Sequence, residues 1–396
     1  MTTSKLVDSW RWFGEQDPVS LKNIKMTGVK HLVSGLHHIP IGEIWSQEEI
    51  SKHKQKIENV GLNWSVAESI PVHESIKYGS PERDIYISNY CQSIKNIASE
   101  GINILCYNFM PIVDWTRTDL MSPNKDGSFC LSFSIIDFII FDIFILKRDQ
   151  SKNNDYSEEQ IQLAKDKFAH MTSEQRIELS DTILKGLPGS MVNSSTLESL
   201  QRQLNIYSKI TKEQLKENLK YFLQSVVPVS EKYGVYLGIH PDDPPINLFN
   251  IPRIVSTLED LEEICDFYPS EHNGLTLCVG SLGSNPKNNI NEIVSKMSSK
   301  VNFLHLRNII CDQSQINLFS FKESEHLVGD INLFNVIKKI NEQNRPIDIY
   351  FRPDHGDLIF DERNSIHINP GYSLLGRFRG LSEIRGIIYC LQKMKV

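Results

Sequence analysis

Short apolar segments alternate along the chain with longer stretches in which apolar residues recur at the spacing of an amphipathic helix. Eight of the short segments have the pattern of strands: residues 10–13, 31–36, 63–69, 102–109, 235–240, 275–279, 301–306 and 347–352. Several are apolar throughout, which is typical of parallel strands that are buried on both faces. Eight strands with helices between them predict an α/β fold, a (β/α)₈ TIM barrel that occupies residues 1–396 as a single domain.

Capping residues indicate where some of the helices begin. Ser46 is followed three residues later by Glu49, and Thr211 by Gln214, which is the pattern of a capping box. Asp17 stands directly before Pro18 and predicts a further helix start, because proline is favoured at the first position of a helix.

One interval of the chain breaks the alternation. Between residues 109 and 235 no segment has a convincing strand pattern, and residues 156–187 and 194–222 have the composition of polar helices. We therefore expect a helical insertion, residues 115–225, after the fourth strand and on the face where the strands end; a small separate domain is the alternative. The apolar run at 135–146 contains two aspartates and is shorter than the roughly 20 residues that a membrane-spanning helix needs.

Composition indicates which classes of binding partner and which cellular location are expected. The formal net charge is −7, whereas a nucleic-acid-binding protein needs a basic surface to neutralise phosphates. The seven cysteines are scattered without close pairing, unlike a disulfide framework, and the first ten residues lack the apolar segment of a secretory signal. We expect a cytoplasmic protein with no nucleic-acid or membrane partner.

Four consecutive strands of the predicted barrel end in a residue that can bind a metal ion, namely His240, Cys278, His305 and Asp354. The carboxyl ends of all strands in such a barrel surround one pocket, so side chains that are distant in sequence meet there. Imidazole, thiolate and carboxylate are ligands of divalent transition metals. The order of the strands thus predicts a His–Cys–His–Asp metal site, and the thiolate alone favours zinc.

Each of these residues also has a purely structural interpretation. A single cysteine at a strand end is commonly a small buried hydrophobic residue, a single histidine packs, and Asp354 can cap the turn before Gly356. Only their occurrence on successive strands favours a metal site. Arg117, Arg377 and Arg379 can bind a carboxylate, although most arginines are solvated surface charges.

Further motifs occur along the whole chain: Trp10-Arg-Trp-Phe-Gly14, Leu36-His-His-Ile-Pro40, Tyr107-Asn-Phe-Met-Pro111, Asp114-Trp-Thr-Arg-Thr118, Gly238-Ile-His-Pro-Asp-Asp-Pro-Pro245, His305-Leu-Arg-Asn308, Arg352-Pro-Asp-His-Gly356 and Asn369-Pro-Gly-Tyr372. Through these motifs and their order, the sequence resembles the mannonate dehydratases of hexuronate catabolism. The resemblance implies a xylose-isomerase-like barrel that converts D-mannonate, a small sugar acid, into 2-keto-3-deoxy-D-gluconate and water.

The resemblance also implies the cofactor and the residues of the site. The working metal would be Mn²⁺ or Fe²⁺, on the same His240, Cys278, His305 and Asp354, and the catalytic pair would be His355 and Tyr372. Which of the two is the base and which the acid stays open. A tyrosine with an ordinary pKa of about 10 suits proton donation, which favours His355 as the base that removes the C2 proton.

Substrate contacts are expected from other strand ends. Arg307 is the preferred partner of the substrate carboxylate, because a guanidinium can bind a carboxylate through two hydrogen bonds. His37, His38 and Asn108 are weaker candidates for contacts with hydroxyl groups, and one of the two histidines is expected to be structural. Two other functions stay open: a metal-dependent sugar isomerase or epimerase on the same barrel, and a non-catalytic sugar-acid-binding barrel. Assembly into a homo-oligomer also stays open.

Overall fold

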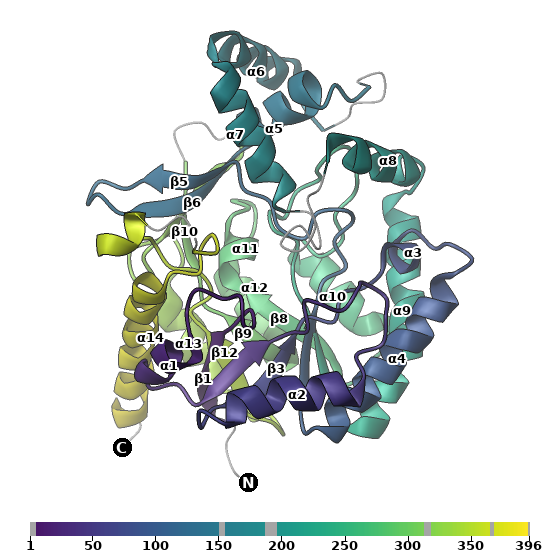
Figure 1. The fold of residues 1–396 in the computed structure, drawn as a ribbon, viewed down its shortest axis with the longest axis vertical. Helices are drawn as coiled ribbons and strands as arrows, with labels where there is room; N and C mark the ends of the chain where they lie inside the picture. Colours follow the sequence, from purple (N-terminus) through teal and green to yellow (C-terminus); the bar gives the residue numbers. More distant parts are fainter. Residues whose placement is uncertain (1–4, 150–154, 187–195, 313–317, 365–367, 395–396) are drawn as a thin grey trace.

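The barrel predicted from the alternation is present in the structure, a computed structural model that describes residues 5–149, 155–186, 196–312, 318–364 and 368–394. Eight parallel strands close in the order β1-β12-β9-β8-β7-β4-β3-β2 (Figure 1). These strands are β1 (Leu6–Arg11), β2 (His31–Ser34), β3 (Asn63–Glu68), β4 (Ile104–Tyr107), β7 (Tyr236–Ile239), β8 (Asn273–Cys278), β9 (Val301–His305) and β12 (Ile349–Arg352).

Helices connect the strands, and most of them surround the barrel (Figure 1). They are α1 (Leu21–Met26), α2 (Gln47–Glu58), α3 (Glu74–Lys77), α4 (Arg83–Ser99), α5 (Ile135–Ile139), α6 (Glu158–His170), α7 (Ser173–Leu184), α8 (Leu197–Tyr207), α9 (Lys212–Tyr233), α10 (Leu258–Phe267), α11 (Val279–Gly283), α12 (Ile290–Met297), α13 (Leu333–Asn341) and α14 (Leu374–Met394).

Strand β1 closes the barrel between β2 and β12. Leu6 lies opposite Ile349, and Ser9 lies opposite His31. This strand begins four residues earlier and ends two residues earlier than the predicted residues 10–13, because Asp8 and Ser9 interrupt its apolar pattern. The buried hydroxyl of Ser9 is satisfied there by donating a 2.7 Å hydrogen bond to the backbone oxygen of Phe351.

Two apolar clusters hold the fold together. The larger one lies between the strands and the surrounding helices. The smaller one fills the barrel interior and comes from strands β2, β3, β4 and β9; its buried members are Val33, Val66, Ile104, Cys106 and Phe303. This packed interior leaves the carboxyl end of the barrel as the place for a pocket.

Two of the three predicted helix starts are confirmed. Ser46 caps α2 and Thr211 forms a reciprocal capping box with Gln214 at the start of α9. The prediction at Asp17 was wrong, because α1 begins after Ser20. The Asp17 carboxylate instead accepts hydrogen bonds from the backbone N–H groups of Phe13 and Val19, which shapes the loop after β1.

The segment between β4 and β7 contains strands as well as helices. The strands β5 (Asp119–Pro123) and β6 (Phe129–Ser134) join β10 (Asn308–Cys311) and β11 (Ser320–Ser324) in an antiparallel sheet, ordered β10-β11-β6-β5. We call it the accessory sheet. The expectation that this interval holds no strand was wrong, because β5 and β6 are short and β6 completes its pairing with β11, which follows almost 190 residues later.

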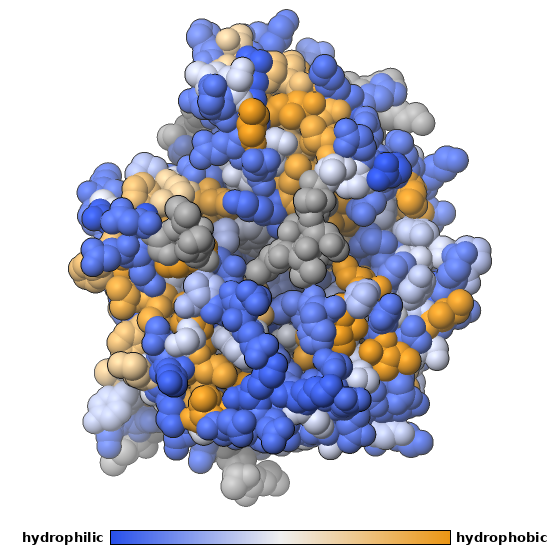
Figure 2. Space-filling model, in the orientation of Figure 1, coloured by the Kyte–Doolittle hydropathy of each residue, from blue (hydrophilic) through white to orange (hydrophobic). Residues whose placement is uncertain are grey.

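Most of the remaining described residues of this segment are helical, and α5, α6 and α7 project from the barrel at the top of Figure 1. The segment contains α5, a π-helix at Ile140–Ile145, then α6, α7 and α8. Figure 2 shows apolar surface on this projection, where Leu163 and Ile177 are exposed, and mostly hydrophilic surface on the barrel below it. Among the described residues, no helix has the length and apolar character required to cross a membrane.

Candidate metal centre and active site

A pocket of about 490 Å³ lies where the barrel strands end. Its charged and polar lining comes from seven strand ends and the loops that follow them: Arg11, His37, Glu68, Asn108, His240, Asp243, Arg307, Arg352, Asp354, His355 and Tyr372. Trp115, Lys185 and Gly186 from the segment between β4 and β7 also line it. The pocket therefore combines residues from nearly the full length of the chain.

The four residues predicted as metal ligands come together beside this pocket, which His240 and Asp354 line. Nε2 of His240 lies 3.2 Å from Nδ1 of His305, and the donor atoms of His240, Cys278 and His305 all lie within 4.8 Å of one another. One carboxylate oxygen of Asp354 lies 3.6 Å from Sγ of Cys278, and the other lies 3.9 Å from Nδ1 of His305. Two nitrogens, a sulfur and an oxygen thus point toward a common region.

The protonation of the two histidines suits a metal ion. Nδ1 of His240 donates its proton to the backbone oxygen of Pro241 over 2.7 Å, which leaves the lone pair of Nε2 directed at His305. Burial, with a contribution from His305, lowers the pKa of His240 to about 4, and burial with nearby Arg352 lowers the pKa of His305. Both rings are therefore neutral at pH 7, the form in which imidazole binds metals.

The other two donors differ in whether they already have the charged form that binds a metal ion. Burial alone would raise the pKa of Asp354, but Arg352 and other nearby cationic groups hold it well below its usual range, so the carboxylate is charged. Burial raises the pKa of the Cys278 thiol far above its usual range. Because a thiol binds metals as thiolate, a cation at this place has to displace the Cys278 proton.

A second group of possible ligands, Glu68, Cys106 and His305, shares one histidine with the first. Both oxygens of Glu68 already accept hydrogen bonds from Arg352, at 3.1 and 2.8 Å. Cys106 belongs to the apolar cluster inside the barrel. The His240–Cys278–His305–Asp354 group is therefore the better candidate for a metal ion.

His355 follows directly on Asp354 at the end of β12. Asp354 itself has a φ of +65°, in the left-handed region that non-glycine residues rarely adopt, and such strain is concentrated at functional sites. The imidazole of His355 meets the ring of Tyr372 edge to face, with 5.0 Å between ring centroids. Gly371 allows this approach, because it has a φ of +80° and a Cβ there would lie 2.8 Å from His355.

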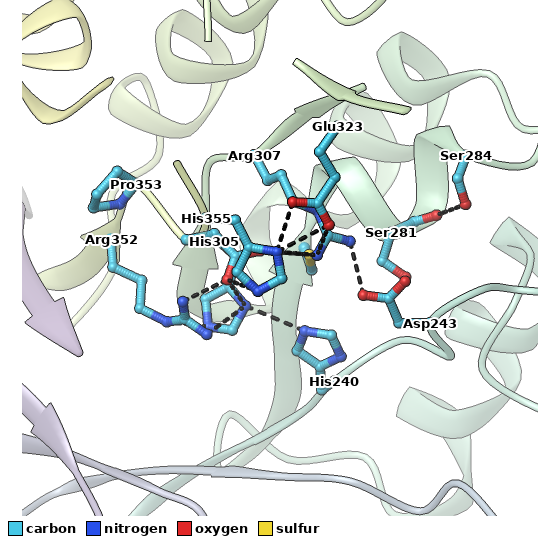
Figure 3. Close-up of polar contacts among 12 residues, drawn as sticks. His240, Asp243, Ser281, Ser284, His305, Arg307, Glu323, Arg352, Pro353 and His355 are labelled. Carbon is cyan, nitrogen blue, oxygen red and sulfur yellow. Dashed lines mark hydrogen bonds and ion pairs between the residues drawn. The ribbon is translucent and has the colours of Figure 1, made fainter. Parts of the chain in front are cut away.

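Behind His355 lies a buried ion cluster, which we define as Arg117, Asp243, Arg307 and Glu323 (Figure 3 shows the last three). Arg117 donates to Asp243 at 2.8 Å and to Glu323 at 2.6 Å, and Arg307 donates to Asp243 at 2.8 Å. Burial alone would raise the pKa of Asp243, but the two arginines hold it below its usual range. The expectation that Arg117 is a solvated surface charge was wrong.

Arg377 is also buried, against the same expectation. Its guanidinium lies 4.2 Å from the centroid of the Trp10 ring and donates to the backbone oxygens of Arg11, Tyr372 and Ser373. It therefore fixes the loop that carries Tyr372. Arg379 is partly exposed and pairs with Asp357 and Glu325.

Of the residues expected to contact the substrate, three line the pocket and one does not. His37 and Asn108 line the pocket, and burial, together with Arg11, lowers the pKa of His37 to about 3, so that its ring is neutral. Arg307 lines the pocket too, although Asp243 neutralises much of its charge. His38 lies outside the pocket: 61% of its side chain is exposed, and its Nε2 lies 2.9 Å from Glu49.

Several residues of the site were missed by the sequence analysis. Arg11, Glu68 and Arg352 are the last residues of β1, β3 and β12, so the rule that identified the metal ligands could have identified them as well. Asp243 lies in the loop after β7, four residues beyond the end of that strand, and Glu323 lies on no barrel strand. Glu323 lies in the accessory sheet, whose pairing has no local signal in the sequence.

Comparisons with known proteins agree with one another. The family model described as D-mannonate dehydratase (UxuA) matches residues 6–396. Mannonate dehydratase 2 of Agrobacterium fabrum is 39% identical over 393 residues, which cover 98% of this chain and 97% of that protein. Mannonate dehydratase of Saccharophagus degradans is 39% identical over 396 residues, which cover 98% of each.

Solved structures extend the comparison. The crystal structure of mannonate dehydratase from Streptococcus suis has a TM-score of 0.77 at 32% identity and covers 99% of this chain and 95% of its own. A xylose isomerase-like TIM barrel protein from Mycobacterium smegmatis has a TM-score of 0.54 at 12% identity, with 99% of each chain covered. The second likeness shows the barrel fold alone.

Proposed function

The chain belongs to the D-mannonate dehydratase family, and from this premise we propose how its pocket eliminates water from the substrate. The protein is a hydro-lyase, and its reaction is the conversion of D-mannonate into 2-keto-3-deoxy-D-gluconate. The observation that carries the proposal is the convergence of two neutral imidazoles, a thiol and a carboxylate next to His355, beside the pocket that His240 and Asp354 line. The segment 115–225 is proposed as part of the same single domain, because three of its residues line that pocket.

His240, Cys278, His305 and Asp354 are the proposed ligands of the metal ion, and Mn²⁺ or Fe²⁺ is its proposed identity. A mixed set of nitrogen, sulfur and oxygen donors suits transition metals better than Mg²⁺ or Ca²⁺, which favour oxygen alone. When bound, the ion supplies a positive charge that stabilises the negative charge developing on the substrate carboxylate and C2.

His355 and Tyr372 are the proposed catalytic residues. His355 removes the C2 proton, and the electrons of the C2–H bond form a double bond between C2 and C3. Tyr372 donates its phenolic proton to the departing C3 hydroxyl group, which leaves as water. Burial raises the pKa of Tyr372, so the residue keeps its proton until the reaction needs it. The resulting enol then tautomerises to the 2-keto acid.

Arg307 and Arg11 are proposed to attract the substrate carboxylate. Arg307 lines the pocket beside His355, with 3.3 Å between its Nη1 and Nδ1 of the histidine. Arg11 lines the pocket as well, and among the described residues no carboxylate oxygen lies within 4.0 Å of its guanidinium. Its charge is thus less neutralised than that of Arg307 or Arg352. His37 and Asn108 are proposed to contact substrate hydroxyls. His38 lies outside the pocket and would have to turn toward it to make such a contact.

A product assay on metal-stripped protein tests this function. The protein is incubated with D-mannonate alone, with Mn²⁺ and with Fe²⁺ under anaerobic conditions, and 3-deoxy-2-keto acid is measured. Product formation that depends on the metal supports the proposal. An epimer or a ketose would indicate a sugar isomerase or epimerase, and binding of mannonate without consumption would indicate a sugar-acid-binding barrel.

We expect Cys278→Ser to weaken metal binding by at least the ~10–100-fold that the loss of a residue supporting a ligand costs, with the fold intact. A serine hydroxyl is a poor ligand because it does not ionise near neutral pH as a thiol does on a metal. Metal content after dialysis against a graded chelator measures the effect. The matched control is Cys390→Ser, since that thiol is exposed and far along α14. Equal metal content in both variants would remove Cys278 from the ligand set.

Replacing Arg11 by methionine should raise KM for D-mannonate by about 10–100-fold, which corresponds to losing a hydrogen bond to a charged group. Methionine preserves much of the side-chain volume without the charge. Steady-state kinetics at saturating metal measures the change, and circular dichroism checks the fold. An unchanged KM would exclude Arg11 as a partner of the carboxylate.

The cytoplasm is the proposed location. All seven cysteines lie among the described residues, and none of them forms a disulfide. Free thiols, six of which are buried or half-buried, are typical of a reducing compartment.

A further inference from the structure

We propose that Glu323 is a positioning residue for the reaction: its carboxylate holds His355 in the orientation and tautomer that proton abstraction requires. The inference rests on the proposed role of His355 as the base. It assigns a function to the accessory sheet, because Glu323 lies on β11, outside the barrel that supplies the other residues.

Both oxygens of Glu323 face one nitrogen of the imidazole. Oε1 lies 2.9 Å and Oε2 lies 2.8 Å from Nδ1 of His355, as the dashed lines in Figure 3 show. Nη1 of Arg307 lies 3.3 Å from the same nitrogen, but a guanidinium has no acceptor. A carboxylate can only accept here, so Nδ1 carries the proton and donates it to Glu323.

The tautomer determines which nitrogen can act as a base. With a proton on Nδ1, the lone pair of the neutral ring is on Nε2, and a base needs that lone pair on the nitrogen that faces the substrate. A second group that orients the base is a recurring part of such sites. Nothing else among the described residues accepts a hydrogen bond from either ring nitrogen of His355 within 3.5 Å.

The carboxylate of Glu323 is itself held rigidly. Nε and Nη2 of Arg117 donate to it at 3.0 and 2.6 Å, and Asp243 holds Arg117 from the other side. The backbone of β11 is paired on both edges, with Glu323 opposite Ile309 of β10 and Phe321 opposite Phe133 of β6. A side chain supported in this way on a paired strand is well suited to orient a neighbour.

A purely structural role is the rival interpretation, since Glu323 also neutralises Arg117. The two interpretations differ in a double-mutant cycle. We expect Glu323→Ala to lower kcat by about 10–100-fold, which is part of the rate enhancement that a general base supplies. KM and metal content should stay within about twofold of the wild-type values. In the His355→Asn background the same substitution should have no further effect on kcat, because the residue on which Glu323 acts is absent.

Glu323→Gln is the second variant, in case alanine disturbs the ion cluster. Its amide oxygen can still accept from Nδ1, so kcat should lie between those of wild type and Glu323→Ala. The control is Glu325→Gln, because Glu325 is partly exposed and pairs with Arg379 outside the pocket. Its kcat should equal that of wild type.

The outcomes separate this inference from the function on which it rests. If wild type forms no product, or if His355→Asn retains full activity, the proposed function fails. If His355→Asn is impaired but Glu323→Ala and Glu323→Gln keep the wild-type kcat, only the inference fails. It also fails if Glu323→Ala lowers kcat equally in both backgrounds, or lowers it only in proportion to lost metal or lost folded protein.

Discussion

Replacing His355 by asparagine is expected to lower kcat by about 10²–10⁴-fold while the protein keeps its fold and its metal, because this range is what a positioned general base contributes. Asparagine preserves the approximate size and polarity of the side chain but cannot accept a proton from C2. The ring of His355 is buried and lies beside Tyr372 and Glu323, so that it is already placed for the reaction. Steady-state kinetics with D-mannonate, together with metal analysis, measures the effect.

Tyr372→Phe should produce a loss of similar size, since only the hydroxyl that donates the proton is removed. Matched controls are His170→Asn and Tyr389→Phe, because both residues are exposed and lie away from the pocket. Rates close to wild type in both pocket variants would contradict the assignment of acid and base. If one variant alone is impaired, the pair does not share the proton transfers.

Removing the charge of Arg117 should have the largest effect on stability. Its side chain is fully buried, and Arg117→Met leaves Asp243 and Glu323 with one cation in place of two. Breaking a buried pair in this way costs about 3–5 kcal/mol, because a charge without its partner remains in a medium that solvates it poorly. Urea unfolding followed by circular dichroism and fluorescence measures the change.

The pH dependence of this loss has a definite sign. The pKa values of Asp243 and Glu323 are held down in the folded protein, against the effect of burial, by the cationic groups beside them. Such carboxylates contribute stability above their unfolded pKa of about 4, and this contribution disappears as the pH falls. The difference between Arg117→Met and wild type should therefore shrink below about pH 4. Arg202→Met, on the exposed side of α8, is the control, and an equal loss in both would contradict the argument.

The barrel and the proposed ligands could be predicted because they follow one simple rule. Buried parallel strands leave apolar runs in the sequence, and the polar residue that ends each run lies at the pocket. His240, Cys278 and His305 were found in this way without knowledge of any contact between them. Arg11 was not, because the strand was expected at residues 10–13, which places Arg11 inside the strand and not at its end.

The ion cluster could not be predicted by the same rule. Glu323 is held near His355 by a strand that pairs with β10, where it lies opposite Ile309, and with β6, whose residues come almost 190 positions earlier. Strands of five or six residues with mixed polarity give no indication of their partners. The adjacent His37 and His38 show a similar limit, since sequence alone does not determine which of two neighbours faces a pocket.

The closure of the barrel by β1 and β12 has a consequence for how the protein is made. Strand β1 is synthesised before the other seven barrel strands, yet one of its two neighbours, at residues 349–351, is the last of them to be synthesised. Until then the nascent sheet has two open edges, which are sites where chains associate wrongly. Asp354 is synthesised after the other three proposed ligands, so the metal site and the closed barrel become complete almost together. We expect chains that stop before residue 349 to aggregate during synthesis and to retain little metal.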